Sequence, residues 1–141
     1  MSTAAITWGT VAEHTLLSTQ LDSLADVTYS SAGSAIDLGA TSPFSIAVEA
    51  KITGTASSTG PLNLYVLWSA DNTDFSEQAA NYQNGQQVEA IDLNGSTETK
   101  KVFSIDVRAR YLKLIAYNDS GASLAANAGD IVATEASVDI T

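Results

Sequence analysis

Residues 44–53 read FSIAVEAKIT, and their pattern indicates the fold class. Apolar side chains occupy every second position: Phe44, Ile46, Val48, Ala50 and Ile52. The positions between them hold Ser45, Ala47, Glu49, Lys51 and Thr53. Successive side chains of a β-strand point to opposite faces, so a period of two predicts a strand with one face in a core.

The same kind of signal continues along the chain from Val27 onward. Residues 62–69 (LNLYVLWS) are apolar on both faces, which is typical of a central strand of a sandwich. Three further segments alternate: 102–107 (VFSIDV), 110–117 (RYLKLIAY) and 131–140 (IVATEASVDI). The last has Val132, Thr134, Ala136, Val138 and Ile140 on one side.

The connections between these segments are typical of an antiparallel fold. Asn84-Gly85 and Asn94-Gly95 supply the positive φ that tight hairpin turns need. About eight strand candidates separated by turns indicate a sandwich or barrel. A long connection such as 71–87 favours Greek-key or jelly-roll topology over a meander. The predicted fold is therefore all-β, an antiparallel β-sandwich of the jelly-roll type over residues 27–141.

Residues 1–26 differ from the rest and are predicted to form an N-terminal arm or a short helix. Thr10 and Glu13 have capping-box spacing, and Val11, Leu17, Leu21 and Leu24 recur at helix-compatible intervals. An isolated helix this short is marginal without packing. An extended arm laid on a neighbouring subunit is the alternative.

Charge and composition argue against several classes of partner. Sixteen acidic and six basic residues give a formal net charge of −10. Phosphate binding depends on Lys and Arg, so we expect no nucleic acid and no anionic membrane as partner. The chain has no cysteine, which excludes disulfides and thiol catalysis. We see neither signal-peptide features at the N-terminus nor a transmembrane run, so we expect synthesis in a cytoplasm.

Catalytic and metal-binding chemistry is weakly represented. His14 is the single histidine, with Glu13 beside it, and no nucleophile motif accompanies it. Asp71, Asn72, Asp74 and Glu77 could in principle hold calcium, but the EF-hand spacing is absent and an ordinary acidic loop is favoured. We therefore predict no enzyme activity, no catalytic residue, no cofactor and no metal.

Aromatic side chains are the stronger candidates for binding. Tyrosine is enriched at protein interfaces, so Tyr65, Tyr111 and Tyr117 are predicted to face a partner subunit. Trp68 lies inside an apolar strand, which favours core packing. A sugar-stacking platform is the alternative for the wider set: Trp8, Trp68, Tyr65, Tyr82, Tyr111 and Tyr117.

Most of the chain resembles a group of small structural proteins of tailed bacteriophages. The resemblance covers LDSLADVTYSSAGSAIDLG (21–39), PFSIAVEAKITG (43–54), LNLYVLWSADNTDF (62–75) and RARYLKLIAYNDSGASLAA (108–126). The matching positions are Leu21, Leu24, Ala25, Asp37, Ser69, Asp71, Phe75, Arg110, Tyr111, Asn118 and Gly121. The resemblance implies a jelly-roll virion protein that docks on the capsid as a decoration or cement protein, or sits in the tail, and it favours a trimer.

About half the chain is also similar to discoidin-type carbohydrate-binding jelly rolls. Ser69, Asp71 and Phe75 match their loop, and Ala109, Arg110, Tyr111 and Lys113 match their strand. Asn72 replaces the usual glycine, and the family's cysteine pair is absent. This resemblance implies the same fold and, as the alternative function, glycan binding or a tail-fibre association.

These observations lead to one set of expectations. The protein is expected to bind the major capsid protein or another virion protein and to stabilise the head shell. It is expected to be a homo-oligomer, on resemblance a trimer, located in a virion assembled in the host cytoplasm. The predicted interface residues are Trp8, Leu16, Leu17, Leu21, Tyr65, Tyr111 and Tyr117.

Overall fold

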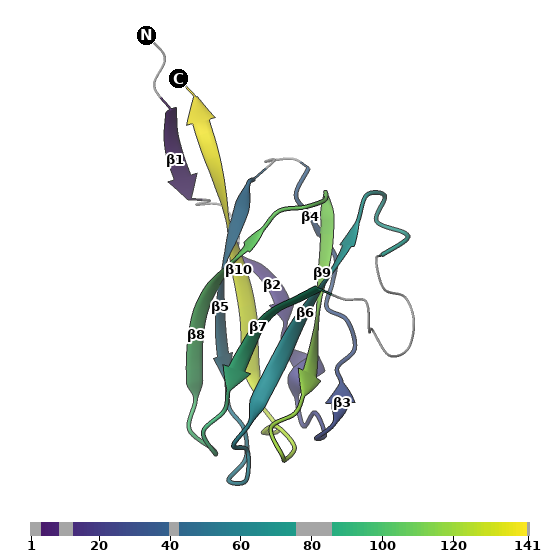
Figure 1. The fold of residues 1–141 in the computed structure, drawn as a ribbon, viewed down its shortest axis with the longest axis vertical. Helices are drawn as coiled ribbons and strands as arrows, with labels where there is room; N and C mark the ends of the chain where they lie inside the picture. The colour runs from purple at the N-terminus through teal and green to yellow at the C-terminus, as the bar shows by residue number, and fades with distance from the viewer. Residues whose placement is uncertain (1–3, 9–12, 40–42, 76–85, 141) are drawn as a thin grey trace.

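The computed structural model describes residues 4–8, 13–39, 43–75 and 86–140. These residues form two antiparallel sheets (Figure 1). Sheet A contains β1 (Ala4–Trp8), β2 (His14–Leu17), β5 (Ser45–Ile52), β8 (Thr99–Asp106) and β10 (Gly129–Ile140). Sheet B contains β3 (Thr28–Tyr29), β4 (Ile36–Asp37), β6 (Pro61–Ser69), β7 (Gln86–Asp92) and β9 (Tyr111–Asn118).

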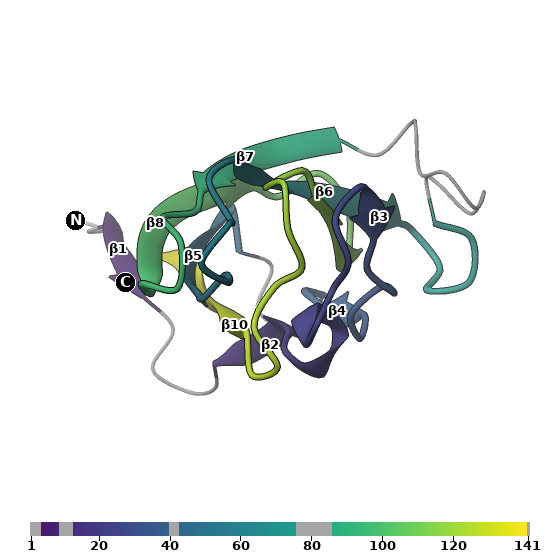
Figure 2. The same ribbon diagram turned by 90° about the horizontal axis from the view of Figure 1, so that it is seen from below.

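The strand order is that of a jelly roll. In sheet A, β10 lies between β5 and the β1 and β2 segments, and β8 forms the edge. In sheet B, β9 lies between β6 and the β3 and β4 segments, and β7 forms the edge. From β2 onward the chain repeatedly crosses from one sheet to the other, while β6 and β7 pair within sheet B. Viewed along the strands, β10 and β2 lie on one side and β6 and β7 on the other (Figure 2). The predicted all-β sandwich is confirmed.

The core lies between the two sheets and follows the alternation in the sequence. On β5 the apolar positions from Ile46 to Ile52 are buried, and the positions between them are not. On β9, Leu112, Leu114 and Ala116 are fully buried. Each fully buried Leu or Ile contributes about 1.5–3 kcal/mol relative to exposure, so the two facing rows supply much of the driving force for folding.

The residues of the N-terminal segment that the structure describes are part of the sandwich. Residues 14–17 form β2, which pairs with β10, and Thr19–Leu21 form a single 3-10 turn. The predicted short helix is therefore wrong. Leu17 pairs with Ile131 and Thr15 with Val132, so Leu16 is an extra residue in a β-bulge. The bulge allows the adjacent Leu16 and Leu17 both to be buried.

Two other details differ from the sequence pattern. Phe44 precedes β5 and is 47% exposed, so it does not extend the buried row of that strand. On β10 the buried positions are Ile131 and Ala133, so the alternating apolar row that includes Val132 lies on the outer face of sheet A. The described residues include no helix with the length and hydrophobicity of a transmembrane span.

Candidate functional site

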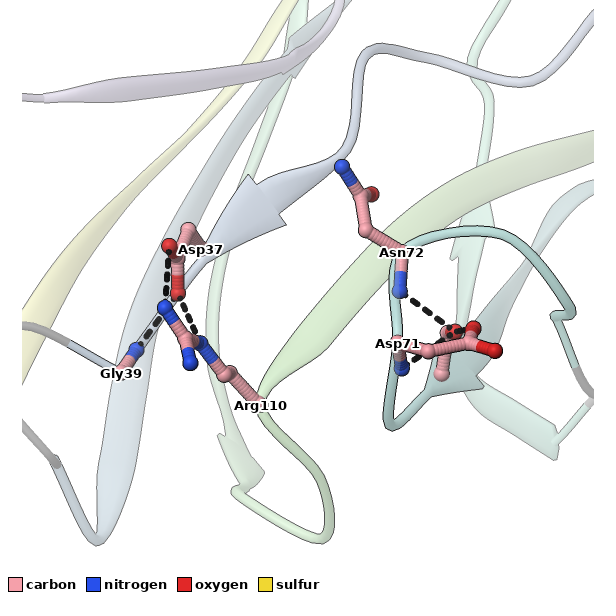
Figure 3. Close-up of polar contacts among 6 residues, drawn as sticks. Asp37, Gly39, Asp71, Asn72 and Arg110 are labelled. Atoms are coloured by element: carbon pink, nitrogen blue, oxygen red, sulfur yellow. Dashed lines mark hydrogen bonds and ion pairs between the residues drawn. The ribbon is translucent and has the colours of Figure 1, made fainter.

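The residues that support the two family resemblances gather at the two ends of sheet B. At one end, Ser69 on β6 pairs with Tyr111 on β9. Arg110 lies just before β9 and binds Asp37 on β4 through two hydrogen bonds, from Nε to Oδ1 at 2.9 Å and from a terminal nitrogen to Oδ2 at 3.1 Å (Figure 3). The Arg110 hydrogen bond, followed by the Gly39 backbone N–H, lowers the pKa of Asp37.

The loop after β6 is held in place by hydrogen bonds to the carboxylate of Asp71. Its Oδ1 accepts hydrogen bonds from the backbone N–H of Thr73 at 2.8 Å and of Asp74 at 2.9 Å, and from the Ser69 hydroxyl at 3.0 Å. The Asp74 and Thr73 amides are the main reason that the pKa of Asp71 is lowered. Asn72 adopts φ of +63°, in the left-handed region where the resembling family has glycine.

These hydrogen bonds give Asp71 a structural role. Three donors already occupy Oδ1 of Asp71, and the end of the loop is anchored by Phe75, which is 7% exposed. Glu77, the fourth residue of the calcium alternative, lies outside the described residues. Within the described ranges no group of three acidic or histidine side chains is close enough to hold a metal ion.

At the other end of sheet B, the side chain of Asn118 binds neighbouring segments through hydrogen bonds. Its fully buried side chain donates to the backbone carbonyls of Leu24 at 2.9 Å and Ala122 at 2.8 Å. Its Oδ1 accepts from the Ser120 backbone at 3.1 Å and hydroxyl at 2.7 Å. Both sets of matching residues therefore hold loops to the sheet.

The strongest candidate site is a tyrosine cluster on the outer face of sheet B, formed by Tyr29, Tyr65 and Tyr117. Tyr29 on β3 lies directly opposite Tyr117 on β9, and their ring centroids are 4.6 Å apart at an interplanar angle of 51°. Tyr29 and Tyr65 on β6 are 6.3 Å apart at 56°. All three side chains are half-buried, so each ring is positioned by its neighbours and keeps an exposed part.

Acidic and amide groups border the tyrosine cluster. Burial raises the pKa of Tyr65 and of Tyr117, and Asp119 adds to both effects. The amide of Gln87 donates to Asn63 Oδ1 at 3.1 Å on the adjoining strands. A neutral phenol can donate one hydrogen bond and also accept one. The cluster is suited to binding.

The structure places the predicted interface residues in different environments. Tyr65 and Tyr117 are brought together, whereas Tyr111 lies at the far end of sheet B, where it packs on the small cluster of Leu67, Phe75 and Ile115. Leu16, Leu17 and Leu21 are each at most 1% exposed and belong to the chain's own core.

The remaining aromatic and histidine predictions are placed as follows. Trp8 occupies the last position of β1, and Tyr82 lies outside the described residues. Trp68 packs against the core, as predicted, and its Nε1 donates to Gln86 Oε1 at 3.0 Å. His14 on β2 contacts Glu135 on β10, with Nε2 and Oε1 3.2 Å apart.

Tyr29 was missed by the sequence analysis. The short run Val27-Thr28-Tyr29 is consistent with a strand, but its proximity to Tyr117 depends on the pairing of β3 with β9. Only the topology supplies that pairing.

Comparisons with known proteins add little to this picture. No protein-family model matches the chain, and no curated protein matches it. Among solved structures, a family 35 carbohydrate-binding module from an environmental isolate is similar, with 7% sequence identity and a TM-score of 0.43. The similarity covers 97% of this chain and 92% of that one.

Proposed function

We propose that this chain is a non-enzymatic structural protein of a tailed-phage virion. It decorates the head and stabilises the shell by binding the major capsid protein. The tyrosine cluster is the observation that supports this proposal, together with the resemblance to small phage structural proteins. The proposal places the protein in a virion assembled in the host cytoplasm, with no nucleic acid or membrane as direct partner.

The chemistry of the tyrosine cluster suits a protein partner. Tyrosine offers a large apolar area with few rotatable bonds and a polar tip, so it binds at a low entropic cost. Tyr29 and Tyr117 already contact each other, which reduces the ordering that binding requires. A specific contact needs about 800 Å² per partner, an area that the outer face of sheet B around the cluster would have to supply.

Oligomerisation would strengthen such a contact. A repeated shell offers many equivalent sites, and a symmetric oligomer engages several of them at once. The phage resemblance implies a trimer, which would convert weak single contacts into stable attachment. The net charge of −10 keeps free copies soluble before they reach the shell.

The test is binding of purified protein to undecorated heads of the phage that encodes it, measured by co-sedimentation. Replacing a central interface tyrosine costs about 2 kcal/mol or more, or about 30-fold in affinity. We therefore expect Tyr65→Ala and Tyr117→Ala each to weaken binding by that factor. Phe44→Ala is the matched control, because it removes a half-exposed aromatic ring that lies just before β5, away from sheet B. Equal binding by all variants would contradict the proposal.

Glycan recognition, on a fibre or elsewhere in the tail, is the second candidate. The amide pair of Asn63 and Gln87 lies on the same sheet as the tyrosines, and amides with aromatic rings are groups that bind sugars. The ring planes of Tyr29 with Tyr65 and with Tyr117 are tilted by 56° and 51°, so they do not form one flat stacking platform. Saturable binding to a glycan array, abolished by Tyr65→Ala, would favour this candidate over the shell.

A further inference from the structure

The tyrosine cluster lies beside exposed carboxylates on the outer face of sheet B. Tyr117 on β9 is opposite Tyr29 on β3, and Asp119 follows two positions later on the same face. The Asp119 N–H donates to the Pro61 carbonyl at 3.0 Å, which continues the pairing of β9 with β6. Pro61 is in turn opposite Asp92 on β7. Asp119 and Asp92 are both exposed, so the row next to the tyrosines carries two negative charges.

The electrostatic effect of these carboxylates reaches the phenols. Burial is the largest cause of the raised pKa of Tyr117, and the negative charges of Asp119 and Asp26 add to it. Burial also raises the pKa of Tyr65, with a smaller contribution from Asp119. Asp26 is held in place, because its Oδ1 accepts a hydrogen bond from the Gly121 N–H at 3.0 Å. The tyrosine rings and the carboxylates therefore form one acidic, aromatic surface.

The positive charges of the chain lie away from this surface. Three of its six lysine and arginine residues are on β5 and β8 of sheet A, and two lie just before β9. The sixth, Lys113, places its Nζ 4.2 Å from the ring centroid of Phe75. All six are among the described residues, and there none of them forms an ion pair with Asp26, Asp92 or Asp119. The six are Lys51, Lys100, Lys101, Arg108, Arg110 and Lys113.

The opposite end of sheet B shows how this chain binds a cation. The guanidinium of Arg110 makes two hydrogen bonds to the carboxylate of Asp37 (Figure 3). The same guanidinium lies 5.1 Å from the ring centroid of Tyr111. An arginine gains from both contacts, because its planar group pairs with a carboxylate and is attracted to an aromatic face. Tyr65 and Tyr117 with Asp119 present the same two kinds of group.

We propose that the tyrosine cluster and Asp119 bind an arginine side chain of the partner protein. The guanidinium packs on the rings of Tyr65 and Tyr117 and donates hydrogen bonds to the Asp119 carboxylate. Charge complementarity selects this occupant, because a chain of net charge −10 attracts a basic segment and repels a second copy of itself. Arginine suits the site better than lysine, since a compact ammonium group cannot pair with a carboxylate through two parallel bonds.

This inference rests on the proposed function for the identity of the partner, the shell protein, but arginine recognition can be tested without a shell. The experiment titrates the full chain with the blocked peptide acetyl-Gly-Arg-Gly-amide and follows the tyrosine ring signals by NMR. A peptide with citrulline in place of arginine is the matched control, because it has a similar shape and no charge. We expect saturable shifts at Tyr65 and Tyr117, and binding of the citrulline peptide about fivefold weaker or less.

Four variants make the test specific to the site, and thermal melts verify that each is folded. Asp119→Asn and Asp106→Asn change the net charge equally, and Asp106 is exposed at the end of β8 in sheet A. Asp119→Asn should weaken binding of the arginine peptide about fivefold, and Asp106→Asn should leave it unchanged. Tyr117→Leu removes the ring and should weaken binding about fivefold, whereas Tyr117→Phe keeps the ring and should stay within about twofold of wild type.

Three results would overturn the inference: no saturable binding of the arginine peptide, equal binding of the arginine and citrulline peptides, or equal losses in Asp119→Asn and Asp106→Asn. Co-sedimentation with heads separates this inference from the proposed function. A chain that prefers the arginine peptide but does not bind heads would contradict the proposed function alone. Head binding that is lost in Tyr65→Ala, with no preference for the arginine peptide, would support the proposed function and contradict the inference.

Discussion

Replacement of Asn118 by alanine tests whether this buried side chain holds the loops at the end of sheet B in place. The side chain is fully buried at the end of β9 and makes four hydrogen bonds, two as donor and two as acceptor. These bonds connect three parts of the chain: the carbonyl of Leu24, the carbonyl of Ala122, and both polar groups of Ser120. Alanine removes all four bonds and leaves their partners behind.

The expected loss follows from the hydrogen bonds. A typical intramolecular bond contributes about 1 kcal/mol net, and an unpaired buried partner adds to the loss. The two bonds to Ser120 are buried, whereas the two to the carbonyls are partly buried and water can replace them in part. We therefore expect Asn118→Ala to lower the free energy of unfolding by about 3 kcal/mol. For a chain of this size that corresponds to a fall in Tm of about 10 °C.

The assay is urea unfolding followed by circular dichroism, with Asn63→Ala as the matched control. Asn63 lies on the adjoining strand β6, one register position away, and makes a single exposed hydrogen bond to Gln87. Its loss should change stability by no more than about 0.5 kcal/mol. If Asn118→Ala stayed within about 1 kcal/mol of wild type but lost binding to heads, the reasoning would be refuted, because Asn118 would then be a binding residue.

Three further predictions concern the core, the acidic loop and one glycine. Leu17→Ala should lose about 2–5 kcal/mol in urea unfolding, because the residue is in the core, whereas Phe44→Ala should lose at most about 1 kcal/mol; similar values for the two would contradict the burial of the N-terminal leucines. Asp71 has a lowered pKa in the folded state, so its stabilising contribution is present at neutral pH and disappears as the pH falls through that folded-state pKa; the Tm of Asp71→Asn should therefore lie below wild type at pH 7 and meet it in acid, and a constant difference would be inconsistent with this. Gly129 has φ of +119°, and a Cβ there would collide with the carbonyl oxygen of Lys51, so Gly129→Ala should cost at least about 1 kcal/mol in a thermal melt; an unchanged Tm would argue against this backbone conformation.

The central strands could be predicted from the sequence because their burial follows a local rule. Along β5 and β9, alternation alone identifies the buried positions, and the structure agrees from Ile46 to Ile52 and at Leu112, Leu114 and Ala116. On β10 the alternation also identifies a strand, but it does not tell which face is buried. That choice depends on the pairing of β10 with β5 and β2.

The N-terminal segment was not predictable by the same rule. The spacing of Leu17, Leu21 and Leu24 fits a helix, yet Leu17 is in a strand and Leu21 ends a 3-10 turn. The bulge opposite Ile131 buries Leu16 and Leu17 side by side, and this breaks the period of two. Tertiary pairing with β10 therefore overrides the local pattern.

The candidate site was predicted in part. The outward positions of Tyr65 and Tyr117 follow from alternation on β6 and β9, and the enrichment of tyrosine at interfaces made them candidates. Tyr29 could not be added, because β3 is two residues long and its place beside β9 comes from the jelly-roll topology.

Imaging of the virion by electron cryo-microscopy tests most directly whether this sandwich is built to bind a shell. Heads of the phage that encodes the chain should carry its density on their outer surface, with Tyr29, Tyr65 and Tyr117 at the contact with the major capsid protein. Heads without this density, or density attached through a different face with the tyrosines open to solvent, would contradict the account.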